Sequence, residues 1–324
     1  MTPLVDRFGR THTYLRVSVT DRCNYRCVYC MPAEGFEWMP REHLLTYEEI
    51  ARLVGVFAHM GIQRVRLTGG EPLLRRDLEL LVQELGSIPG LTDIALTTNG
   101  HRLAACAEKL VQGGLSRVNV SLDSLDPQRF SEMTRGGKLE KVLEGIEAAV
   151  AAGLRPVKIN AVVLAGVNED EIISLVERFS GPQYVLRFIE YMPFEARWHR
   201  CVPGRELRRR LRERWDLTPS GEKLGDGPAV HWVLSNGARV GFISPLSEKF
   251  CSSCNRLRLM ADGHLRTCLS DDGTPSLRDY LRGGAADEEI AAAIRAMVMT
   301  KREGHLATEE GGIPFEGVMT RVGG

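Results

Sequence analysis

The sequence LRVSVTDRCNYRCVYC, residues 15–30, decides the fold of this chain. It begins with a strand-like segment, Leu15–Val19, and runs directly into a loop that carries Cys23, Cys27 and Cys30. Three thiolates this close in sequence converge only if the loop wraps a metal centre, and a closed zinc site needs four ligands. We therefore expect a [4Fe–4S] cubane held by three cysteines, whose open iron can chelate a small molecule and pass it an electron.

The residues around this loop affect both the ionisation of its thiols and the choice of metal. Arg22 and Arg26 flank the cysteines, and we expect their positive charge to help keep the thiols ionised. No fourth cysteine or histidine lies near the loop in sequence, because His12 and His43 are each more than ten residues away. The alternative is therefore a zinc knuckle completed by a distant residue.

Alternating strand and helix patterns continue outward from the loop. The strand-like segments are Leu15–Val19, Arg64–Thr68, Ile94–Thr98, Arg117–Ser121, Val157–Val163 and Tyr184–Glu190. The helical patterns between them are Tyr47–Met60, Asp77–Leu85, Ala104–Gln112, Leu139–Ala152 and Glu169–Phe179, with Thr46 and Asn168 placed as N-caps. Repeated βα units predict a parallel α/β sheet, open or curled into an incomplete six-stranded barrel, with ligands at the carboxyl ends of the strands.

The pattern changes after Arg200. A helix is expected over Gly204–Trp215; its arginines could form a phosphate-binding patch, but we favour a solvated face paired with Glu206 and Glu213. Further expected elements are a hairpin over Val230–Leu234 and Ala238–Ile243 and helices over Leu277–Leu281 and Glu288–Lys301. We therefore divide the chain into a partial-barrel domain, residues 1–203, and a smaller C-terminal α+β domain, residues 204–324.

Composition narrows the possible partners and compartment. The chain has 324 residues, 43% of them hydrophobic, a formal net charge of zero and a pI near 7.1, which gives no electrostatic reason to expect a nucleic acid or an anionic membrane. No apolar run approaches the roughly 20 residues that span a bilayer, and the start has no continuous apolar stretch, so we expect a cytoplasmic protein. In a reducing cytoplasm the eight cysteines should be thiols; Cys106 and Cys201 stand alone and are expected to be inert.

A second cysteine group lies in the C-terminal part. Cys251 and Cys254 form a CxxC pair, and Cys268 follows. Zinc with an additional ligand such as His264 is one interpretation; a second cluster carried by the C-terminal domain is the one we favour. Arg256 and Arg258 alternate along an extended segment, so both guanidinium groups should face one side and suit a polyphosphate. The chain has no P-loop, so a nucleotide would be held by scattered arginines and lysines.

The first cysteine loop, with Tyr29 before its last cysteine, resembles the signature of the radical S-adenosylmethionine (SAM) superfamily. The resemblance implies that the open iron binds the methionine moiety of SAM and that reductive cleavage gives a 5′-deoxyadenosyl radical. It also implies SAM contacts from Tyr29, from Gly70 in the segment TGGEP (residues 68–72), from Ser121 and from Met192.

Along essentially its whole length the chain resembles the GTP 3′,8-cyclase family, molybdenum cofactor biosynthesis protein A. The most specific blocks are residues 15–29, 68–72, 97–100, 121–123 and 251–258, and the terminal Gly323-Gly324. The resemblance implies two [4Fe–4S] clusters, removal of the ribose 3′ hydrogen of GTP and attack of the sugar radical on guanine C8, with the guanine near the open iron of the second cluster. The GTP contacts that it implies are Arg16, Arg66, Thr97, Lys158, Arg187, Arg256 and Arg258. Arg16, Arg256, Arg258 and the glycine tail are the implied catalytic parts.

Other functions and partners stay open at this point. A radical enzyme that modifies a peptide or inserts sulfur is the alternative within the superfamily, and a protein with two zinc sites is the alternative outside it. The partners implied by the resemblance are GTP, SAM, an electron donor such as flavodoxin or ferredoxin, and cyclic pyranopterin synthase downstream. A monomer and a homodimer are both compatible with the sequence.

Overall fold

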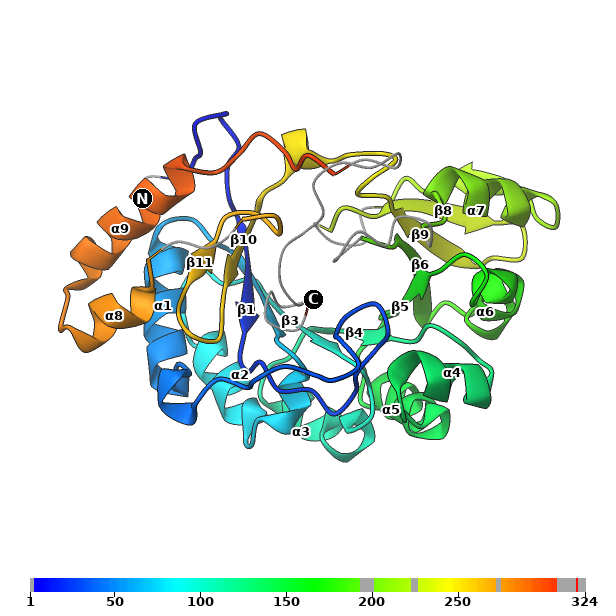
Figure 1. Ribbon diagram of the computed structural model, residues 1–324, viewed down its shortest axis with the longest axis horizontal. Coiled ribbons are helices and arrows are strands. Elements are labelled where there is room, and N and C mark those ends of the chain that lie inside the picture. Colours follow the sequence, from blue (N-terminus) through cyan, green and yellow to red (C-terminus); the bar gives the residue numbers. More distant parts are fainter. Residues whose placement is uncertain (1–2, 193–200, 223–226, 272–274, 308–318, 320–324) are drawn as a thin grey trace.

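In the computed structural model, which describes residues 3–192, 201–222, 227–271, 275–307 and 319, the strands of these ranges form one continuous sheet. Its order is β11-β10-β1-β2-β3-β4-β5-β6-β9-β8-β7, and it curls into an arc (Figure 1). The central strands are β1 (Tyr14–Ser18), β2 (Arg64–Thr68), β3 (Asp93–Thr98), β4 (Arg117–Ser121), β5 (Val157–Val163) and β6 (Tyr184–Glu190), each parallel to the next.

Helices follow the central strands and cover the convex side of the arc (Figure 1). They are α1 (Tyr47–His59), α2 (Leu78–Gly86), α3 (Ala107–Gln112), α4 (Pro127–Thr134), α5 (Leu139–Ala151) and α6 (Ile172–Arg178). The C-terminal part adds α7 (Gly204–Arg212), α8 (Leu277–Arg282) and α9 (Asp287–Met299). Because every parallel connection passes over one side of the sheet, the other side stays available for a ligand.

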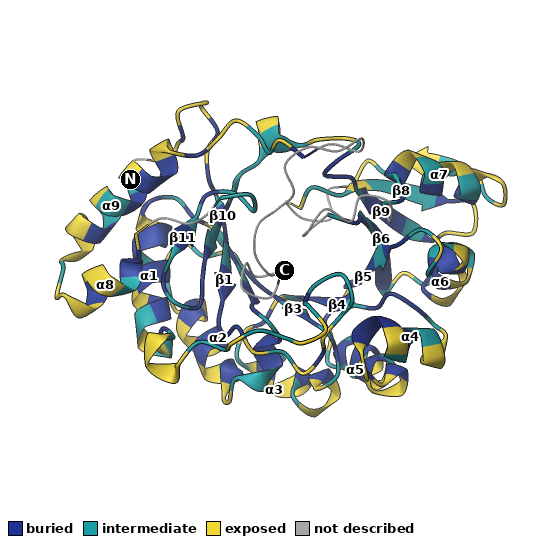
Figure 2. Ribbon diagram, in the orientation of Figure 1, coloured by how far each residue is buried: buried dark blue, intermediate teal, exposed yellow. Residues whose placement is uncertain are grey.

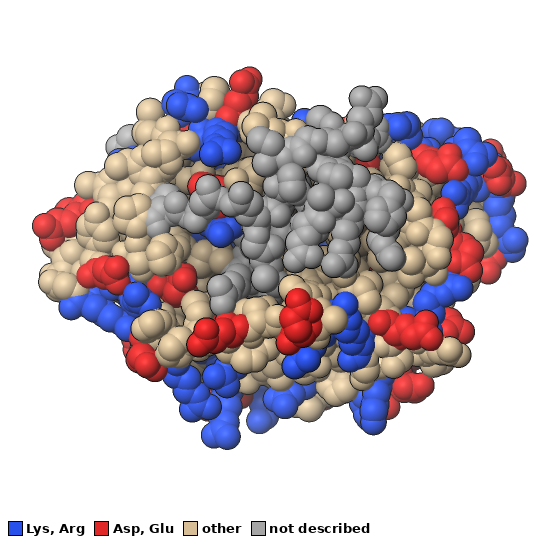
Figure 3. Space-filling view, viewed as in Figure 1, with Lys and Arg blue, Asp and Glu red and all other residues tan. Residues whose placement is uncertain are grey.

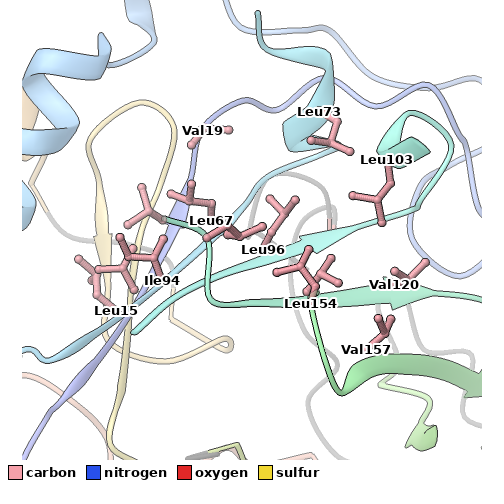
Figure 4. Close-up of a cluster of buried hydrophobic side chains, with 14 of the residues drawn as sticks. Leu15, Val19, Leu67, Leu73, Ile94, Leu96, Leu103, Val120, Leu154 and Val157 are labelled. Carbon is pink, nitrogen blue, oxygen red and sulfur yellow. The ribbon is translucent and has the colours of Figure 1, made fainter. Parts of the chain in front are cut away.

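The alternation of side chains along the strands explains this division. On β1 the apolar residues Leu15 and Val17 are fully buried, whereas Arg16 between them is only half-buried and points to the concave side. Dark blue residues accordingly line the strand–helix contacts in Figure 2. Figure 4 shows Leu67, Leu96 and Val120 from neighbouring strands packed in one apolar cluster.

The strands of the C-terminal part extend both edges of this same sheet. β10 (Arg256–Leu259) pairs parallel with β1 and carries β11 (Leu265–Arg266), while β9 (Arg239–Ile243) pairs parallel with β6 and carries β8 (Val230–Leu234) and β7 (Leu217–Pro219). The predicted hairpin is therefore confirmed as β8–β9, and it continues the sheet. Strands from both sides of residue 203 share this one sheet. The division of the chain into two domains at that residue stays a prediction.

Most predicted elements appear in the structure, but α4, β7 and β11 were not predicted, and the helix predicted over Gly204–Trp215 ends at Arg212. The prediction missed α4, although Pro127 at its first turn and Asp126, which accepts a hydrogen bond from the Arg129 amide (2.7 Å), are ordinary start signals. Thr46 is confirmed as an N-cap, but Asn168 does not cap a helix. Its amide donates to the carbonyls of Asp123 (2.7 Å) and Val162 (2.9 Å), so it joins two strand ends instead.

Most arginines of α7 lie on a solvated face, as predicted, but the Arg208 side chain is largely buried and pairs with Glu248. Arg209 pairs with Glu206 (2.8 Å) and Glu213 (2.6 Å), and Arg210 pairs with Glu206 (2.8 Å) and Glu169 (2.9 Å). Figure 3 shows basic and acidic side chains interspersed at the end of the molecule where α7 lies. No helix in the described ranges is long and apolar enough to cross a membrane.

Candidate active site

The loop with Cys23, Cys27 and Cys30 follows β1 and is seated on the glycine segment that follows β2. The Gly70 amide donates to the Thr20 carbonyl (2.8 Å), and the Glu71 amide donates to the Arg22 carbonyl (2.7 Å). A Cβ atom on Gly70 would lie 2.2 Å from the Arg22 carbonyl oxygen, so only glycine permits this approach. The TGGEP segment therefore fixes the backbone that enters the first cysteine loop.

Glu71 joins this segment to the end of β3. Its buried carboxylate accepts hydrogen bonds from the Thr98 hydroxyl (2.6 Å) and from the amides of Asn99 (2.7 Å) and Leu73 (3.0 Å). Burial raises the pKa of Glu71 to about 7, against the effect of these hydrogen bonds. The Asn99 side chain in turn donates to Asn24 in the cysteine loop (2.9 Å). Sequence reasoning did not single out Glu71; an acidic residue between glycine and proline at a strand end was the available signal.

Tyr29 connects the cysteine loop to the end of β4. Its hydroxyl donates to the carboxylate of Asp123 at 2.6 Å, and the second carboxylate oxygen of Asp123 accepts from the Val162 amide at 2.8 Å. Burial raises the pKa of Asp123 to about 6, partly offset by these two hydrogen bonds. Ser121, also predicted as a SAM contact, ends β4 and is the register partner of Asn160 on β5. Tyr29 and Ser121 therefore belong to the same carboxyl edge of the sheet.

The two cysteine groups differ in electrostatic environment, and one expectation was wrong. Burial raises the pKa of Cys23 to about 11 and that of Cys27 well above its ordinary value, with the neighbouring thiols adding to the effect at Cys27. The side chains of Arg22 and Arg26 are exposed to water, which screens their charge, so they do not keep these thiols ionised. Burial therefore favours the protonated thiols, and a bound metal centre would favour the thiolates.

The second cysteine group is set between basic residues. Cys251 begins the short helix η6 (Cys251–Ser253), Cys254 ends it, and Cys268 follows β11. Burial raises the pKa of the Cys254 thiol, but the charges of Arg256 and Lys301 outweigh it and bring the pKa to about 7. An Arg256 nitrogen lies 3.7 Å from the Cys254 sulfur, and the Ser270 hydroxyl lies 3.4 Å from the Cys268 sulfur.

The arrangement of the thiols bears on the two alternative zinc sites, one at each cysteine group. Within the described ranges, which include all the cysteines, no three side chains of Cys, His, Asp or Glu converge on a single metal ion. The ring of His264, the suggested zinc ligand, instead contacts Asp262 at 3.0 Å. Because the thiolates of a cubane bind different irons, they do not need to meet at one point. Each group offers three free thiols, the number of ligands that a cubane with one open iron takes.

A row of basic side chains crosses the concave side of the sheet. Arg258 on β10, Arg16 on β1 and Arg66 on β2 are successive register partners. Burial lowers the pKa of all three, and each feels at least one neighbouring cation; the pKa of Arg258 falls to about 10. Arg256, two residues before Arg258, faces the same side, as the alternation predicted.

The basic row continues over the next strands. Lys158 on β5 is buried, and burial together with Arg187, Arg117 and Arg66 lowers its pKa to about 6. Arg117 was missed in the sequence, although its alternation with Asn119 and Ser121 on one strand was a usable signal; it pairs with Asp93. The positive charge is therefore shared among strands that lie far apart in sequence.

Amide side chains hold Arg187 and Thr97 in this row. The Arg187 guanidinium donates to Asn160 (2.9 Å) and to Asn119 (2.9 Å), and burial followed by repulsion from Arg66 lowers its pKa to about 9. The Asn119 amide nitrogen also donates to the Thr97 hydroxyl (3.1 Å). Both predicted GTP contacts therefore lie on the concave side of adjacent parts of the sheet.

Several buried polar atoms near this row have no hydrogen-bond partner in the part of the chain that the structure describes. They are Arg66 Nε, the Tyr14 hydroxyl and His231 Nε2. Tyr14 and Arg66 are on neighbouring strands and their side chains touch, with the Arg66 guanidinium carbon 5.5 Å from the Tyr14 ring centre. Buried donors without partners are costly, so a polar ligand that reaches them would be stabilised.

Two predicted parts of the site remain, the SAM contact Met192 and the glycine pair Gly323-Gly324. Met192 follows β6 and packs with Leu246, Met260 and Ala307 beside the second cysteine region. Gly323 and Gly324 lie outside the described residues.

Comparisons with known proteins agree with this geometry. The Radical SAM superfamily profile matches residues 17–179, and the Molybdenum Cofactor Synthesis C profile matches residues 184–307. Among solved structures, Streptococcus suis SuiB bound to S-adenosylmethionine superimposes with a TM-score of 0.58 at 14% identity, covering 82% of this chain and 62% of that one; this likeness shows the fold alone.

Curated relatives are much more similar. The GTP 3′,8-cyclase of Moorella thermoacetica is 46% identical over 98% of this chain and 99% of its own length, and that of Paracoccus denitrificans is 48% identical over 94% and 90%. Molybdenum cofactor biosynthesis protein 1 of Mus musculus is 44% identical over 93% of this chain and 48% of the longer mouse protein. With such identity over nearly its full length, this chain belongs to the radical SAM superfamily and, within it, to the GTP 3′,8-cyclase family.

Proposed function

We propose that this chain converts GTP to (8S)-3′,8-cyclo-7,8-dihydroguanosine 5′-triphosphate, the first step of molybdenum cofactor biosynthesis. The observation that carries the proposal is the row Arg258–Arg16–Arg66 on three adjacent strands. Beside it lie buried polar atoms that have no hydrogen-bond partner among the described residues. Like charges this close, in a buried setting, are stabilised by a polyanion between them, and a triphosphate is such a group.

As a member of its family the chain uses SAM and carries two [4Fe–4S] clusters. We assign the first cluster to Cys23, Cys27 and Cys30 and the second to Cys251, Cys254 and Cys268. When bound, the first cluster and SAM supply the 5′-deoxyadenosyl radical that removes the 3′ hydrogen of the ribose. The six assigned cysteines are free thiols and so are available to both clusters.

The protein's own contribution is to bind and orient the two small molecules. Arg16, Arg256 and Arg258 offer planar forks that match phosphate oxygens, and we place the triphosphate there. Arg66, Thr97, Lys158 and Arg187 complete the GTP site along the same concave side. Fixing the triphosphate fixes the ribose and the guanine relative to each other, and holding reacting atoms together lowers the entropic part of the barrier.

We place SAM at the carboxyl edge of the central strands. The backbone around Gly70, the Tyr29 side chain, Ser121 and Met192 are its proposed contacts. The short hydrogen bond from Tyr29 to Asp123 supports this assignment, because it holds the tyrosine ring beside the first cysteine loop. The Glu71 contacts hold the opposite side of that loop.

The remaining assignments rest on the family resemblance and on the chemistry of the thiols. We propose that Gly323 and Gly324 take part in the reaction together with Arg16, Arg256 and Arg258. We also propose a cytoplasmic location, in line with eight cysteines that are all free thiols. Reduced flavodoxin or ferredoxin is the proposed electron donor, and cyclic pyranopterin synthase the proposed consumer of the product.

An anaerobic incubation of the reconstituted protein with GTP, SAM and dithionite tests the function directly. We expect 5′-deoxyadenosine together with 3′,8-cyclo-7,8-dihydro-GTP. This product is an isomer of GTP, because the 3′ hydrogen atom lost to the radical is replaced by one electron and one proton. Chromatography separates it from GTP, and mass spectrometry identifies it. About eight irons per chain should accompany activity. Cleavage of SAM without any GTP-derived product, and with no equilibrium binding of GTP, would favour a peptide-modifying or sulfur-inserting enzyme instead.

A further inference from the structure

The segment that follows α9, residues 301–304, packs around the second cysteine group. Its lysine ammonium and its glycine contact the regions that carry Cys251, Cys254 and Cys268. Two of its backbone carbonyls accept hydrogen bonds from Arg10. Neither the composition nor the family resemblance singled out this segment.

Lys301 lies between the two halves of the cysteine group. Its ammonium donates to the carbonyl of Arg256 (3.1 Å), two residues after Cys254, and to the carbonyl of Thr267, the residue before Cys268. The side chain is only 2% exposed, which is costly for an ammonium unless anions offset the lost hydration. Burial lowers the pKa of Lys301, and the charges of Arg10 and Arg256 add to this effect, while the thiols of Cys254 and Cys268 favour the charged form.

Arg10 holds the other end of the segment. Its guanidinium donates to the carbonyls of Cys251 (2.8 Å), Arg302 (2.7 Å) and Glu303 (2.7 Å), and its Nε donates to the buried carboxylate of Asp6 (2.7 Å). One side chain therefore joins the segment to the first cysteine of the group. Asp6 fixes the direction in which Arg10 points.

Gly304 packs directly against the side chain of Cys251. A Cβ atom at this position would lie 3.3 Å from that sulfur and 3.2 Å from the Cys251 Cβ, so a side chain here would crowd the ligand. The segment thus approaches all three cysteines, Cys251 through Gly304 and Arg10, and the other two through Lys301.

We propose that Lys301 is a positioning residue for the second [4Fe–4S] cluster, which it serves in two ways. It ties the strand after Cys254 to the loop before Cys268, and its buried positive charge raises the reduction potential of the cluster. The second effect follows because a cluster held by thiolates becomes more negative on reduction, and a nearby cation in a medium of low dielectric constant stabilises that form. The proposal rests on the assignment of Cys251, Cys254 and Cys268 as ligands made under the proposed function.

The test uses the full chain with Cys23, Cys27 and Cys30 replaced by Ser, so that only the second cluster is present. Lys301→Met removes the charge and both hydrogen bonds, Lys301→Gln keeps a donor without the charge, and Lys301→Arg keeps the charge. Arg302→Met is the matched control, because it removes the adjacent cation, whose side chain is exposed. The readouts are the midpoint potential, from a redox titration followed by electron paramagnetic resonance, and the rate of iron loss to a chelator.

We expect Lys301→Met to lose iron about 10- to 100-fold faster, as is common when a group that orients metal ligands is removed. Its potential, and that of Lys301→Gln, should shift to more negative values, while Lys301→Arg and Arg302→Met stay close to the parent. If the Lys301→Met variant binds no iron, the midpoint potential of the cluster in the Lys301→Gln variant tests the role of the charge. A potential equal to that of the parent would overturn that role.

Two further results would overturn the proposal. The first is that the cluster of the Lys301→Met variant has the same midpoint potential and loses iron to the chelator at the same rate as the parent. The second is that the midpoint potential of the Arg302→Met variant shifts as much as that of the Lys301→Met variant. Absence of any cluster in the parent would instead refute the ligand assignment, and with it this role of Lys301. None of these measurements uses GTP or SAM, so a failure here leaves the cyclase assay as a separate test of the proposed function.

Discussion

Arg16 on β1 and Arg258 on β10 are register partners in adjacent parallel strands, so two guanidinium groups from opposite ends of the sequence lie side by side. Burial lowers the pKa of Arg16, and the next largest cause is the charge of Arg258. This pairing is unfavourable in the ligand-free protein and becomes favourable when a polyanion binds between the two groups. The predictions below test this and the other assignments of the site.

Replacing Arg258 with Met should weaken GTP binding about ten- to a hundred-fold, the usual effect of losing one charge-assisted contact worth roughly 1.5–3 kcal/mol. The thermal stability of the ligand-free protein should not fall, because a repulsive neighbour of Arg16 is removed. Equilibrium dialysis without SAM measures the affinity, and Arg209→Met on the exposed face of α7 is the control. Unchanged affinity with both clusters intact would remove Arg258 from the triphosphate site.

GTP binding should take up about one proton through Lys158. Burial and the charges of neighbouring arginines lower its pKa to about 6, from an ordinary value of 10.5 in the unfolded chain. Between these values the unfolded state holds the extra proton, so this group's contribution to ligand-free stability rises with pH and is least favourable below pH 6. A bound triphosphate favours the charged form, so the proton returns on binding.

Calorimetry at pH 8 in buffers of different ionisation enthalpy measures this proton uptake. Lys158→Met should abolish it, and the same buffers applied to that variant subtract the titration of the nucleotide itself. Equal uptake by the two proteins would show that Lys158 does not gain its charge from GTP.

Replacing Cys27 with Ser should abolish reductive cleavage of SAM, with or without GTP, because the proposed first cluster would lose one of three thiolate ligands. The measurement is 5′-deoxyadenosine formed under dithionite. Cys106→Ser is the matched control, since that thiol lies outside both groups and contacts the Arg102 carbonyl (3.3 Å). Normal 5′-deoxyadenosine formation by Cys27→Ser would contradict the assignment of the first cluster.

Replacing Cys251, Cys254 and Cys268 together with Ser should leave one cluster and some cleavage of SAM. Cyclised product should disappear, because the proposed substrate site would lose its second cluster while the first cysteine loop keeps its supports at Glu71 and Asp123. Iron analysis and product analysis on the same sample measure both effects. Continued cyclisation would exclude the second cluster from the reaction.

Deleting Gly323 and Gly324, or replacing both with Ala, should cut cyclisation severely while cluster content and fold are kept. Glycine loses more backbone freedom than other residues when it is fixed, but two glycines without side chains can enter a narrow space. The assay is product per cluster-loaded enzyme, with circular dichroism as the control for folding. Turnover equal to that of the unmodified protein would show that the tail acts only as a chain end.

The sequence by itself determined what depends on near neighbours in the chain. Strand alternation placed Arg256 and Arg258 on one side of an extended segment, and the spacing of Cys23, Cys27 and Cys30 indicated a metal-binding loop at the end of the first strand. These signals are local, because side-chain direction along a strand and the closure of a short loop are fixed by backbone geometry.

Only the tertiary structure decided which distant residues meet. Parallel pairing of β10 with β1 brings Arg258 beside Arg16, and the chain after α9 returns to place Lys301 between Cys254 and Cys268. It also corrected the role given to Arg22 and Arg26, which face water and leave the first thiols with raised pKa values. The physical reason is that burial and long-range charge depend on all the elements packed around a group, and a motif contains only its own neighbours.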